Sequence, residues 1–549
     1  MILVLHPEFL RWIPLLLMIA TTGTAASATA ELMRSRVEHL RTEQNPTIRG
    51  ASIAAAMVLA DFYERREFNL AWTAPEKIAD LIRLLESADE HGLDPRDYHL
   101  PAIETLRRGN GAQMPTARQR VDLDLLLTDS LVSFAYHTRF GKVDPASLDS
   151  NWNFERRPIT EHPVGNLETA IGAGSLEQFV RQLIPEPYFY QWLRRGLTRY
   201  RQIHAAGGWR PIPGGPSLKV GAMGPRVEQL RERLRRTGDL TSADPADAAL
   251  FDKALEVAVI TFQARHGLDR DGVVGARTLR ALNIPIETRI DQIRVNLERM
   301  RWVYQNLPDD YLLLDIAGYN AYLVRHGQEI WKARTQVGRP YRETPVFRAD
   351  MRYLVFNPLW TVPPIILIND VLPEARREPA YLTRNQMRLV DDTGQTVSID
   401  AVDWASVSAW NFPYTVRQDP GPNNALGRVK FVFPNKHLVY LHDTPSKNLF
   451  EHSQRTFSSG CIRVERPFEL AELLLEDVAH WNAERIQRVL ASGQTETVHL
   501  ASPVPVLLFY WTAKADESGT VHFRADIYGR DQRVLRVLRK PFKFRALPA

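Results

Sequence analysis

A change of hydrophobic period near residue 311 constrains the fold of this chain more than any other sequence feature. Up to about residue 205, apolar residues recur at intervals of three and four, which is the spacing of amphipathic helices. The clearest examples are Ala51 to Tyr63, Ile78 to His91 and Val121 to Tyr136. Beyond residue 311, apolar residues form short runs of strand length that turn residues separate. We therefore expect a multidomain α+β protein, helical in its N-terminal part and β-rich in its C-terminal part.

The β-rich part contains several predicted strands and one predicted helix. His326-Gly327 is expected to form a hairpin turn between two of the strands. An amphipathic helix is expected after Pro467, with Leu470, Leu474 and Val478 on one face. The predicted strands are Leu312 to Ile316, Tyr319 to Arg325, Glu329 to Val337, Leu354 to Asn357, Val429 to Phe433, Leu438 to His442, Val504 to Tyr510 and Val521 to Asp526.

The length of 549 residues is too great for one hydrophobic core and suggests about three or four folded units. Proline and glycine are concentrated between Pro211 and Pro216, which indicates a linker. We predict a helical scaffold domain over residues 31–210, a small module over residues 216–285 and a β-rich domain over residues 297–531. The helical domain shows no catalytic pattern of residues, so scaffolding or partner binding is its expected role.

Two segments of the C-terminal part differ from their surroundings in composition. Residues 374–420 are richer in charged and turn residues, and we expect them to form a lid or substrate-capping insertion. A surface loop without function would have a similar composition. Residues 532–549 contain many arginines and lysines and are predicted to form a basic tail, for which a solvated surface is the expected role.

The N-terminus has the pattern of an export signal. Arg11 precedes the apolar run Trp12 to Ala20, and the small residues Ala26-Ser27-Ala28 fit the rule for signal cleavage. The run is shorter than the roughly 20 residues that span a bilayer. We predict that residues 1–30 are a secretory signal peptide or, if they are retained, a signal anchor. Contact with a membrane is expected only in the second case.

Charge and cysteine content narrow the functional classes. The net charge of +5 comes from 69 basic and 64 acidic residues, a weak excess that suits an anionic partner without requiring one. The chain lacks the basic density and the motifs of a nucleic-acid binder. Cys461 is the only cysteine of the sequence. In an exported protein, an unpaired cysteine is either an inert buried residue or a thiol kept for its chemistry.

The small module has two helical stripes and a third short helix. The first stripe contains Val227, Leu230 and Leu234, and the second runs from Leu255 to Phe262. The turn at 271–275 precedes a third helix in which Thr278 is either a core residue or a cap. Two segments of this module resemble the three-helix peptidoglycan-binding module of wall enzymes: "LKVGAMGPRVEQLRERL" and "VITFQARHGLDRDGVVGARTLRALN". The resemblance implies binding to glycan or stem peptide; a bundle without a ligand is the alternative.

The surroundings of Cys461 favour a catalytic thiol. Side chains alternate along a strand, so Tyr440 and His442 share the face opposite Val439 and Leu441. A histidine in this position suits a general base. Gly460 allows an unusual backbone conformation and a close approach, which would expose the thiol and free nearby N–H groups for an oxyanion. Arg463 would lower the pKa of the thiol or bind a substrate carboxylate.

A longer stretch around these residues resembles a known signature. In "HDTPSKNLFEHSQRTFSSGCIRVERP", fifteen residues separate His442 from Ser458, and Ser459-Gly460-Cys461 follow. This is similar to the signature of L,D-transpeptidase catalytic domains (YkuD type), and "VFNPLWTVPPIILINDVLP" also resembles that family. With the helical domain and the small module, the chain resembles the large L,D-transpeptidases of Gram-negative bacteria. Many relatives have histidine in place of Ser459 and asparagine in place of Arg463, so His442 must be the base.

The resemblance implies a function and a set of site residues. Cys461 would be the nucleophile and His442 the general base, with the Gly460 backbone and Tyr440 supporting the oxyanion. Ser458, Ser459 and Arg463 would contact the substrate. The reaction implied is a 3–3 cross-link between peptidoglycan donor and acceptor stem peptides in the periplasm, with loss of D-alanine and without a metal or an organic cofactor. Other cell-wall synthesis enzymes are further candidate partners.

Three other functions fit parts of the same sequence. Attack of water on the thioester would make the enzyme an L,D-carboxypeptidase, and attack by a protein lysine would anchor a lipoprotein to the wall. A non-catalytic wall-binding scaffold would use the helical domain and the small module. That last function gives no reason for His442, Gly460 and Cys461 to occur together.

Overall fold

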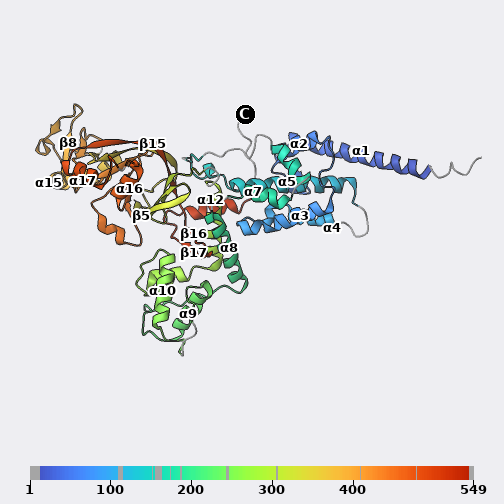
Figure 1. Cartoon of the computed structure of the whole chain (residues 1–549), viewed down its shortest axis with the longest axis horizontal. Helices are drawn as coiled ribbons and strands as arrows, with labels where there is room; N and C mark the ends of the chain where they lie inside the picture. Colours follow the sequence, from blue (N-terminus) through green and yellow to red (C-terminus); the bar gives the residue numbers. More distant parts are fainter. Residues whose placement is uncertain are drawn as a thin grey trace, which may run out of the picture.

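The computed structural model describes residues 13–108, 115–150, 152–154, 163–172, 175–185, 188–242, 247–303, 307–408, 410–477 and 479–542. Figure 1 shows a helical part, a β-rich part at the opposite end and a small module below them. Residues 1–12 of the predicted export signal lie outside the described residues, and so do Val478 and residues 543–549 of the predicted tail. Within the described part, no helix has both the length and the apolar character needed to cross a membrane.

The N-terminal part is a bundle of helices around α5, as the hydrophobic period predicts. Its helices are α1 (Ile13–Thr42), α2 (Ala56–Arg65), α3 (Pro75–Glu86), α4 (Leu100–Arg108), α5 (Ala117–Phe140), α6 (Pro163–Gly172), α7 (Leu176–Leu183) and α8 (Tyr188–Ala205). Helix α5 begins at a capping box between Thr116 and Gln119. The predicted cleavage sites of the signal lie within α1. The predicted helix from Ala51 starts later, because β1 (Thr47–Ile48) and β2 (Ala51–Ser52) form a hairpin.

Helix α5 is buried on most of its surface and carries polar side chains into the bundle. Two of its buried carboxylates accept hydrogen bonds from main-chain N–H groups, so their desolvation is compensated. Asp124 accepts from Ala71 and Trp72, both at 2.9 Å. Asp129 accepts from Ala55 at 2.7 Å. These bonds join the loops before α2 and α3 to the centre of the bundle.

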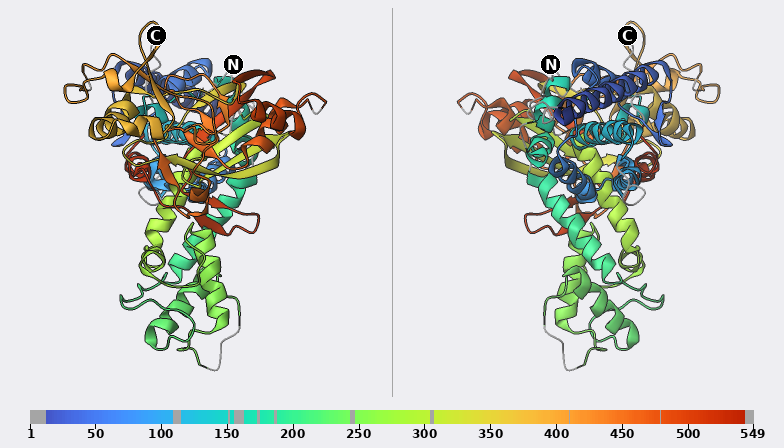
Figure 2. Two further views of the ribbon diagram at one scale, coloured as in Figure 1. Left: turned by 90° about the vertical axis from the view of Figure 1, so that its left-hand side faces the viewer. Right: turned by 90° about the vertical axis from the view of Figure 1, so that its right-hand side faces the viewer.

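The small module is a three-helix unit with its own core. Its helices are α9 (Pro225–Thr237), α10 (Lys253–Arg265) and α11 (Ala276–Leu282). The core contains the predicted stripes of Val227, Leu230 and Leu234. Thr278 is buried, and its hydroxyl accepts from Gln263 at 3.2 Å, so it is a core residue and not a helix cap. Figure 2 shows the module projecting from the rest of the molecule in two views.

Helix α12 (Ile286–Arg301) connects the module to the β-rich part and packs against α8. A fully buried ion pair joins Arg301 to Glu298 at 2.8 Å. Removing one partner of such a pair costs about 3–5 kcal/mol, because the other charge stays buried. Arg299 pairs with Asp531 at 2.5 Å. Asp531 stands at the start of α18 (Arg530–Leu538).

The basic tail prediction is wrong for its first residues. Val534, Leu535 and Leu538 are buried at helical spacing in α18, which packs on α12. The arginines between them lie on the outer side of an amphipathic helix. The apolar stripe was present in the sequence but was outweighed by the high arginine content.

The β-rich part is a nine-stranded sheet in the order β13-β5-β14-β12-β11-β6-β15-β3-β4, which closes because β5 also pairs with β4. The predicted strands are present, but the strand predicted over Leu438 to His442 is shorter and is limited to β12. Leu438 has a positive φ of 54°, which is not a strand conformation. Helices α16 (Pro467–Leu475) and α17 (Ala483–Ser492) cover a core inside the sheet. The strands are β3 (Tyr311–Asp315), β4 (Asn320–Arg325), β5 (Gln328–Gly338), β6 (Arg348–Phe356), β11 (Val429–Val432), β12 (Leu441–His442), β13 (Thr456–Ser458), β14 (Ile462–Val464) and β15 (Glu496–Phe509).

The region of the predicted lid folds as a separate small unit, here called the capping unit (residues 360–418). Strands β7 (Trp360–Thr361), β10 (Thr415–Gln418), β8 (Met387–Val390) and β9 (Thr396–Val397) form its four-stranded sheet. Helices α13 (Pro364–Ile366), α14 (Leu372–Arg377) and α15 (Ala380–Arg384) pack on it. It has its own apolar core, which includes Val371, Leu389 and Val416. The unit therefore begins before residue 374, where the charged composition starts.

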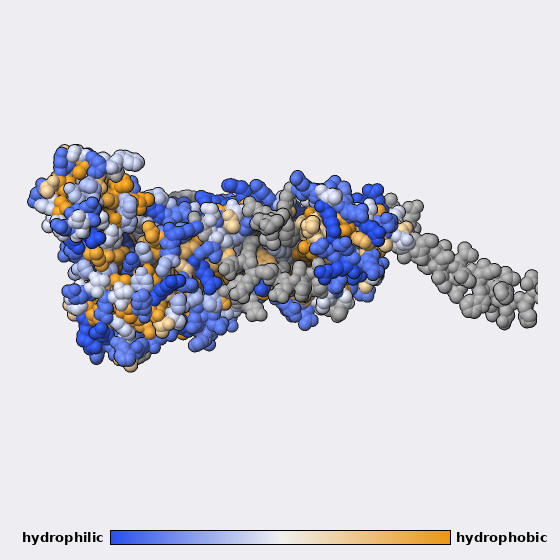
Figure 3. Space-filling model, turned by 90° about the horizontal axis from the view of Figure 1, so that it is seen from above, coloured by the Kyte–Doolittle hydropathy of each residue, from blue (hydrophilic) through white to orange (hydrophobic). Residues whose placement is uncertain are grey.

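A last hairpin, β16 (Ala513–Ala515) with β17 (Val521–Phe523), lies between the three parts. Arg265 of the module donates to the carbonyl of Val521 at 3.0 Å. Val521 also contacts Gly196 of α8 so closely that a Cβ at Gly196 would lie 2.5 Å from it. On the face seen in Figure 3, hydrophobic residues are interspersed with hydrophilic ones over both ends of the molecule.

Candidate active site

Four neighbouring strands bring the candidate residues to the outer face of the sheet. Strand β12 pairs in parallel with β14, and His442 is opposite Arg463. On the other side of β12, Lys430 of β11 is opposite His442. On the other side of β14, Gln336 of β5 is opposite Arg463. Residues directly opposite one another share a face, so these four side chains form one row across the sheet.

Cys461 and Tyr440 form the next row on the same face. Cys461 immediately precedes β14, and the N–H of Ile462 donates to the carbonyl of Tyr440 at 2.9 Å. The thiol is partly exposed, and its Sγ lies 3.8 Å from the carbonyl oxygen of Leu438. The apolar neighbours Leu441 and Ile462 point into the core instead. Tyr440 and His442 thus share one face, as the sequence predicts, and the pairing of β12 with β14 places Cys461 on that face as well.

The turn before Cys461 is held by hydrogen bonds and by a glycine. Gly460 has a φ of +115°, a conformation that L side chains rarely adopt. Its carbonyl accepts from the hydroxyl of Thr344 at 2.8 Å, and its N–H donates to the hydroxyl of Ser458 at 3.2 Å. Ser458 is buried, and its hydroxyl also donates to the carbonyl of Cys461. These bonds fix the position of the thiol.

Two sequence predictions about this turn need correction. The Gly460 N–H is bound to Ser458, so it is not free to stabilise an oxyanion. Ser458 is buried within the turn, so it shapes the turn and does not present its hydroxyl to a substrate. Both residues were predicted from position alone, and only the fold shows which groups are already paired.

Burial keeps His442 and Cys461 uncharged at rest. Burial, together with the charge of Arg463, lowers the pKa of His442 to about 3. Its Nδ1 donates to the carbonyl of Asp443 at 2.5 Å, so Nε2 is the basic nitrogen. Burial also raises the pKa of the Cys461 thiol, while the Tyr440 main chain, Lys430 and Arg463 oppose that rise. The two groups share one face of the sheet, and a neutral imidazole can accept the proton of a thiol when the sulfur attacks.

Lys430 is a cation near the thiol that the sequence prediction missed. Its Nζ lies 3.6 Å from the centre of the Tyr440 ring, a cation–π contact. Burial lowers the pKa of Lys430, while the nearby Cys461 acts in the opposite direction. Within the described part of the chain, neither Lys430 nor Arg463 has an acidic partner. Their charges are therefore available to a thiolate, an oxyanion or a substrate carboxylate.

Residues 309–479, which contain these strands, match the family described as "L,D-transpeptidase catalytic domain". The chain contains an L,D-transpeptidase catalytic domain. Residues 58–197 match the "Scaffold domain" family, and residues 223–282 match the family described as "Putative peptidoglycan binding domain". The three matches follow the three parts of the fold.

One curated relative extends the comparison. The chain is 37% identical over 251 residues to a Haemophilus influenzae protein described as "Putative L,D-transpeptidase". The match covers 45% of this chain and 50% of the relative, so the chain spans half the length of that protein.

Two solved structures of L,D-transpeptidases are also similar, at low identity. One is from Xylanimonas cellulosilytica, is 15% identical and has a TM-score of 0.17. The alignment covers 54% of this chain and 99% of the Xylanimonas chain. The other is from Stackebrandtia nassauensis, is 13% identical and has a TM-score of 0.21. The alignment covers 55% of this chain and 97% of the Stackebrandtia chain. Likenesses this low add nothing to the assignment of the fold.

The capping unit of this L,D-transpeptidase domain is bound to the turn that carries Cys461. Arg342, in the loop between β5 and β6, forms an ion pair with Asp370 of the capping unit. The same guanidinium donates to the hydroxyl of Ser459 at 2.9 Å. Ser459 is therefore linked to the capping unit through Arg342. The sequence prediction singled out neither residue: Arg342 lies outside the segments that resemble the family, and Asp370 lies in one of them but away from Cys461 in the sequence.

Apolar side chains are exposed around this junction. Tyr341 is 72% exposed, Leu438 67% and Ile365 56%. Exposed apolar residues gathered near a polar site are typical of a binding surface. Within the described residues, no group of three or more histidine, cysteine or acidic side chains could hold a metal ion. The candidate site thus contains a thiol, an imidazole and two cations, and Arg342 links its turn to the capping unit.

Proposed function

We propose that the protein is an L,D-transpeptidase that forms 3–3 cross-links between peptidoglycan stem peptides through a thioester on Cys461. The observation that carries this proposal is the common sheet face of Cys461 and His442, with Lys430 and Arg463 beside them and no acidic partner for either cation among the described residues. The match of this region to the catalytic domain family supports the same chemistry.

The first half-reaction makes the thioester. The Cys461 sulfur attacks the carbonyl carbon of the L-centre of the diamino acid in a donor tetrapeptide, and Nε2 of His442 takes the thiol proton. The carbonyl oxygen becomes an oxyanion, which Lys430 and Arg463 stabilise by charge. The bond to D-alanine then breaks, and His442 gives the proton to the leaving amine.

Tyr440 is a further donor to the oxyanion. Burial, followed by the charge of Cys461, raises the pKa of the Tyr440 phenol, so its hydroxyl stays protonated at neutral pH. A protonated hydroxyl beside the thiol can donate to the developing negative charge. This supports the role for Tyr440 predicted from the sequence.

The second half-reaction forms the cross-link. The side-chain amine of an acceptor stem attacks the thioester carbonyl, and His442 removes the excess proton of that amine. The carbon–sulfur bond breaks, and the thiolate regains its proton. The capping unit, bound through Arg342 and Asp370, favours this outcome over hydrolysis if it excludes water from the thioester.

The expected location follows from the substrate. Peptidoglycan stem peptides are accessible in the periplasm, so we propose that residues 1–30 direct export. This segment is then either cleaved or retained as an anchor. We further propose that the module of residues 223–282 binds the wall. Other cell-wall synthesis enzymes remain candidate partners of the scaffold helices.

The test is to incubate the purified protein with disaccharide-tetrapeptide and to identify the products by mass spectrometry. The proposal predicts a dimer that has lost one D-alanine. The dimer should disappear in Cys461→Ala. In His442→Ala the rate should fall by about 10²–10⁴-fold, the usual contribution of a general base.

A nearby histidine provides the matched control. His437 packs on Phe347, with ring centres 4.9 Å apart, and lies off the row that contains His442. His437→Ala should retain the dimer. Tripeptide as the only product would identify a carboxypeptidase instead. A dimer that persists in Cys461→Ala would contradict the proposal.

A further inference from the structure

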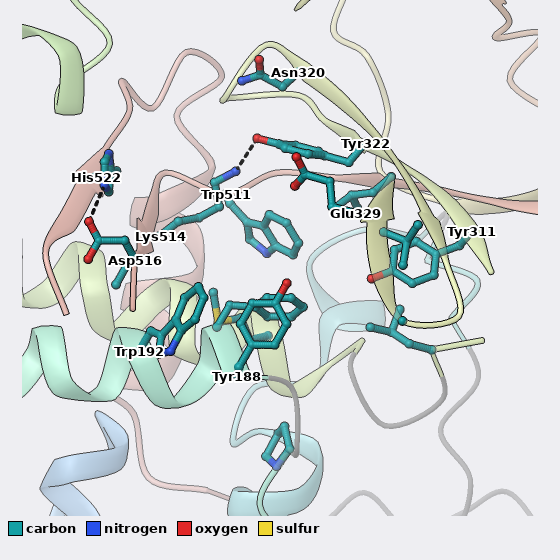
Figure 4. A pocket seen from close by; sticks show the side chains of 18 of the residues that line it. Tyr188, Trp192, Tyr311, Asn320, Tyr322, Glu329, Trp511, Lys514, Asp516 and His522 are labelled. Atoms are coloured by element: carbon teal, nitrogen blue, oxygen red, sulfur yellow. Dashed lines mark hydrogen bonds and ion pairs between the residues drawn. The ribbon is translucent and has the colours of Figure 1, made fainter. Parts of the chain in front are cut away.

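A cavity of about 940 Å³ lies away from Cys461, between helix α8 and the outer face of the catalytic sheet. Figure 4 shows it from close by, with side chains from both parts around one hollow. Pockets of this size between domains commonly bind ligands. The aromatic residues that line it are Tyr188, Phe189, Trp192, Tyr311, Tyr322 and Trp511, and polar ones include Asn320, Glu329, Lys332, Lys514, Asp516 and His522.

Aromatic faces dominate two walls of the cavity. On α8, Tyr188 and Trp192 lie with ring centres 4.4 Å apart, and Tyr188 is 49% exposed. On the sheet side, Tyr322 lines the same hollow, and Trp511, which is only 4% exposed, lies behind it (Figure 4). The face of an aromatic ring carries negative charge density. Such faces attract the weakly positive C–H groups on the flat sides of pyranose rings.

Lys514 holds the sheet wall in place. Its Nζ donates to Asp315 at 2.6 Å and to the hydroxyl of Tyr322 at 3.2 Å. The same ammonium lies 4.9 Å from the centre of the Tyr322 ring and 5.6 Å from that of Trp511. The two rings are therefore fixed before a ligand binds, which lowers the entropy cost of binding.

The polar residues at the cavity suit a ligand with many hydroxyl and amide groups. The carboxylate of Glu329, which can accept hydrogen bonds, lines the cavity, and so does the pair His522–Asp516, 3.3 Å apart. Burial and the charge of Glu329 raise the pKa of the Tyr188 phenol, so that hydroxyl can donate. Acidic and basic groups are mixed around the cavity, which disfavours a purely anionic or a purely apolar ligand. A sugar fits both the rings and the mixed polar groups.

Strand β5 connects this cavity to the active site. Lys332 lines the cavity, and Gln336, four residues later, accepts a hydrogen bond from Arg463 at 3.2 Å. Both lie on the same face of β5, because side chains alternate, and they are separated by roughly 13 Å at about 3.3 Å per residue. Between them on the same face, Arg334 pairs with Glu451 and Glu465, and Gln336 is buried, so a polymer that occupies the cavity reaches Cys461 only by passing beside this cluster.

We propose that this cavity is a saccharide subsite that binds the glycan backbone of peptidoglycan while a stem peptide of the same strand reaches Cys461. The identity of the polymer rests on the proposed function, whereas sugar binding itself does not. The subsite would explain why the scaffold helices are packed against the catalytic sheet: they supply one aromatic wall of it.

The test measures binding separately from catalysis. The full chain with Cys461→Ala is titrated with a peptide-free oligosaccharide of alternating N-acetylglucosamine and N-acetylmuramic acid, and heat is recorded by calorimetry. Tyr188→Ala and Glu329→Gln, each added to that chain, should raise Kd at least tenfold. Both side chains are exposed, so both variants should unfold at the temperature of their parent.

Trp410→Ala is the matched control, since Trp410 is 98% exposed on the capping unit and should leave Kd unchanged. An unchanged Kd in both Tyr188→Ala and Glu329→Gln would place the sugar elsewhere, for example on the module, and would overturn the proposal. So would a failure to bind the oligosaccharide at all.

A second arm uses free tetrapeptide with active enzyme. The Tyr188→Ala enzyme should consume it at the unmodified rate, because the peptide does not reach the cavity, but should cross-link intact glycan strands at least fivefold more slowly. A loss of both activities in equal measure would contradict a saccharide subsite. If unmodified enzyme consumes no tetrapeptide while sugar binding still depends on Tyr188, the proposed function fails and the subsite stands.

Discussion

At the residue scale, the reactivity of this site depends on which charges lie beside the thiol. Burial raises the pKa of Cys461, and a cation stabilises the thiolate against that effect. Lys430 provides such a charge from β11, next to the ring of Tyr440. Its contribution can be measured without the substrate.

Lys430→Met removes this charge while keeping a long side chain. We expect the pKa of the thiol to rise, so alkylation of Cys461 by iodoacetamide should need a higher pH and be roughly three- to tenfold slower at neutral pH, the effect of about 1 kcal/mol. Rates measured across a pH series test this. Lys436→Met, in the exposed turn before Leu438, should alkylate like the unmodified protein. Identical pH profiles for the two variants would contradict the role of Lys430.

Sequence patterns singled out Cys461, His442 and the charge of Arg463, but not Lys430. Cys461 and His442 stand out because strand alternation and Gly460 mark them locally. Lys430 and Gln336, on strands, and Arg342, in the loop after β5, come near Cys461 because the strands lie in the order β5-β14-β12-β11. This order differs from the order of the strands in the sequence. The single local signal for Lys430 was a lysine between the apolar residues of its strand, Val429 and Phe431.

At the scale of elements, the turn from β13 to β14 sets the position of the thiol. A Cβ at Gly460 would meet no atom closer than 3.8 Å, so crowding does not explain the glycine. Its φ of +115° does, because an L residue there is strained by about 1–3 kcal/mol. The strain would be relieved by moving Cys461.

Gly460→Ala should therefore lower both the stability and the rate of cross-linking, the latter by at least tenfold. Gly394→Ala is the matched control. Gly394 also has a positive φ of +87° with open space around it, but it lies in a turn of the capping unit. That variant should lose a similar amount of stability, measured by urea unfolding, with little loss of activity. Full activity in Gly460→Ala would show that the turn tolerates another backbone conformation.

Element prediction from the sequence succeeded where one pattern covered a whole element. Short apolar runs bounded by turn residues predicted β3, β4 and β5, and helical spacing predicted α5. It failed at α18, where the many arginines outweighed the stripe of Val534, Leu535 and Leu538. It also failed at the start of α2, because the pairing of Thr47–Ile48 with Ala51–Ser52 is a contact between segments and leaves no local pattern.

At the scale of the whole molecule, buried neutral histidines in all three parts make stability depend on pH. Burial lowers the pKa of His91 and His137 in the scaffold helices, His266 in the module and His442 in the catalytic domain. The unfolded chain binds protons at these groups below about pH 6.5 and the folded chain does not. Stability is therefore complete above that pH and is lost as the pH falls.

We expect the free energy of unfolding to fall by about 1.4 kcal/mol per pH unit for each such histidine below about pH 6.5. His137→Phe should reduce this slope by the contribution of one histidine. A phenylalanine suits this position because His137 packs among aromatic rings. Urea unfolding at several pH values measures the slope. His326→Gln, at a position with a 92% exposed side chain, should leave it unchanged. An unaltered slope in His137→Phe would mean that this histidine is protonated in the folded protein.

The most direct test of the catalytic account is to trap the thioester. The protein is mixed with donor tetrapeptide without an acceptor, quenched in acid within seconds and digested, and the peptide that contains Cys461 is weighed by mass spectrometry. The account predicts a mass increase equal to the donor tripeptide acyl group on Cys461, reversed by hydroxylamine. Free D-alanine released without any adduct on Cys461, or an adduct on another residue, would contradict it.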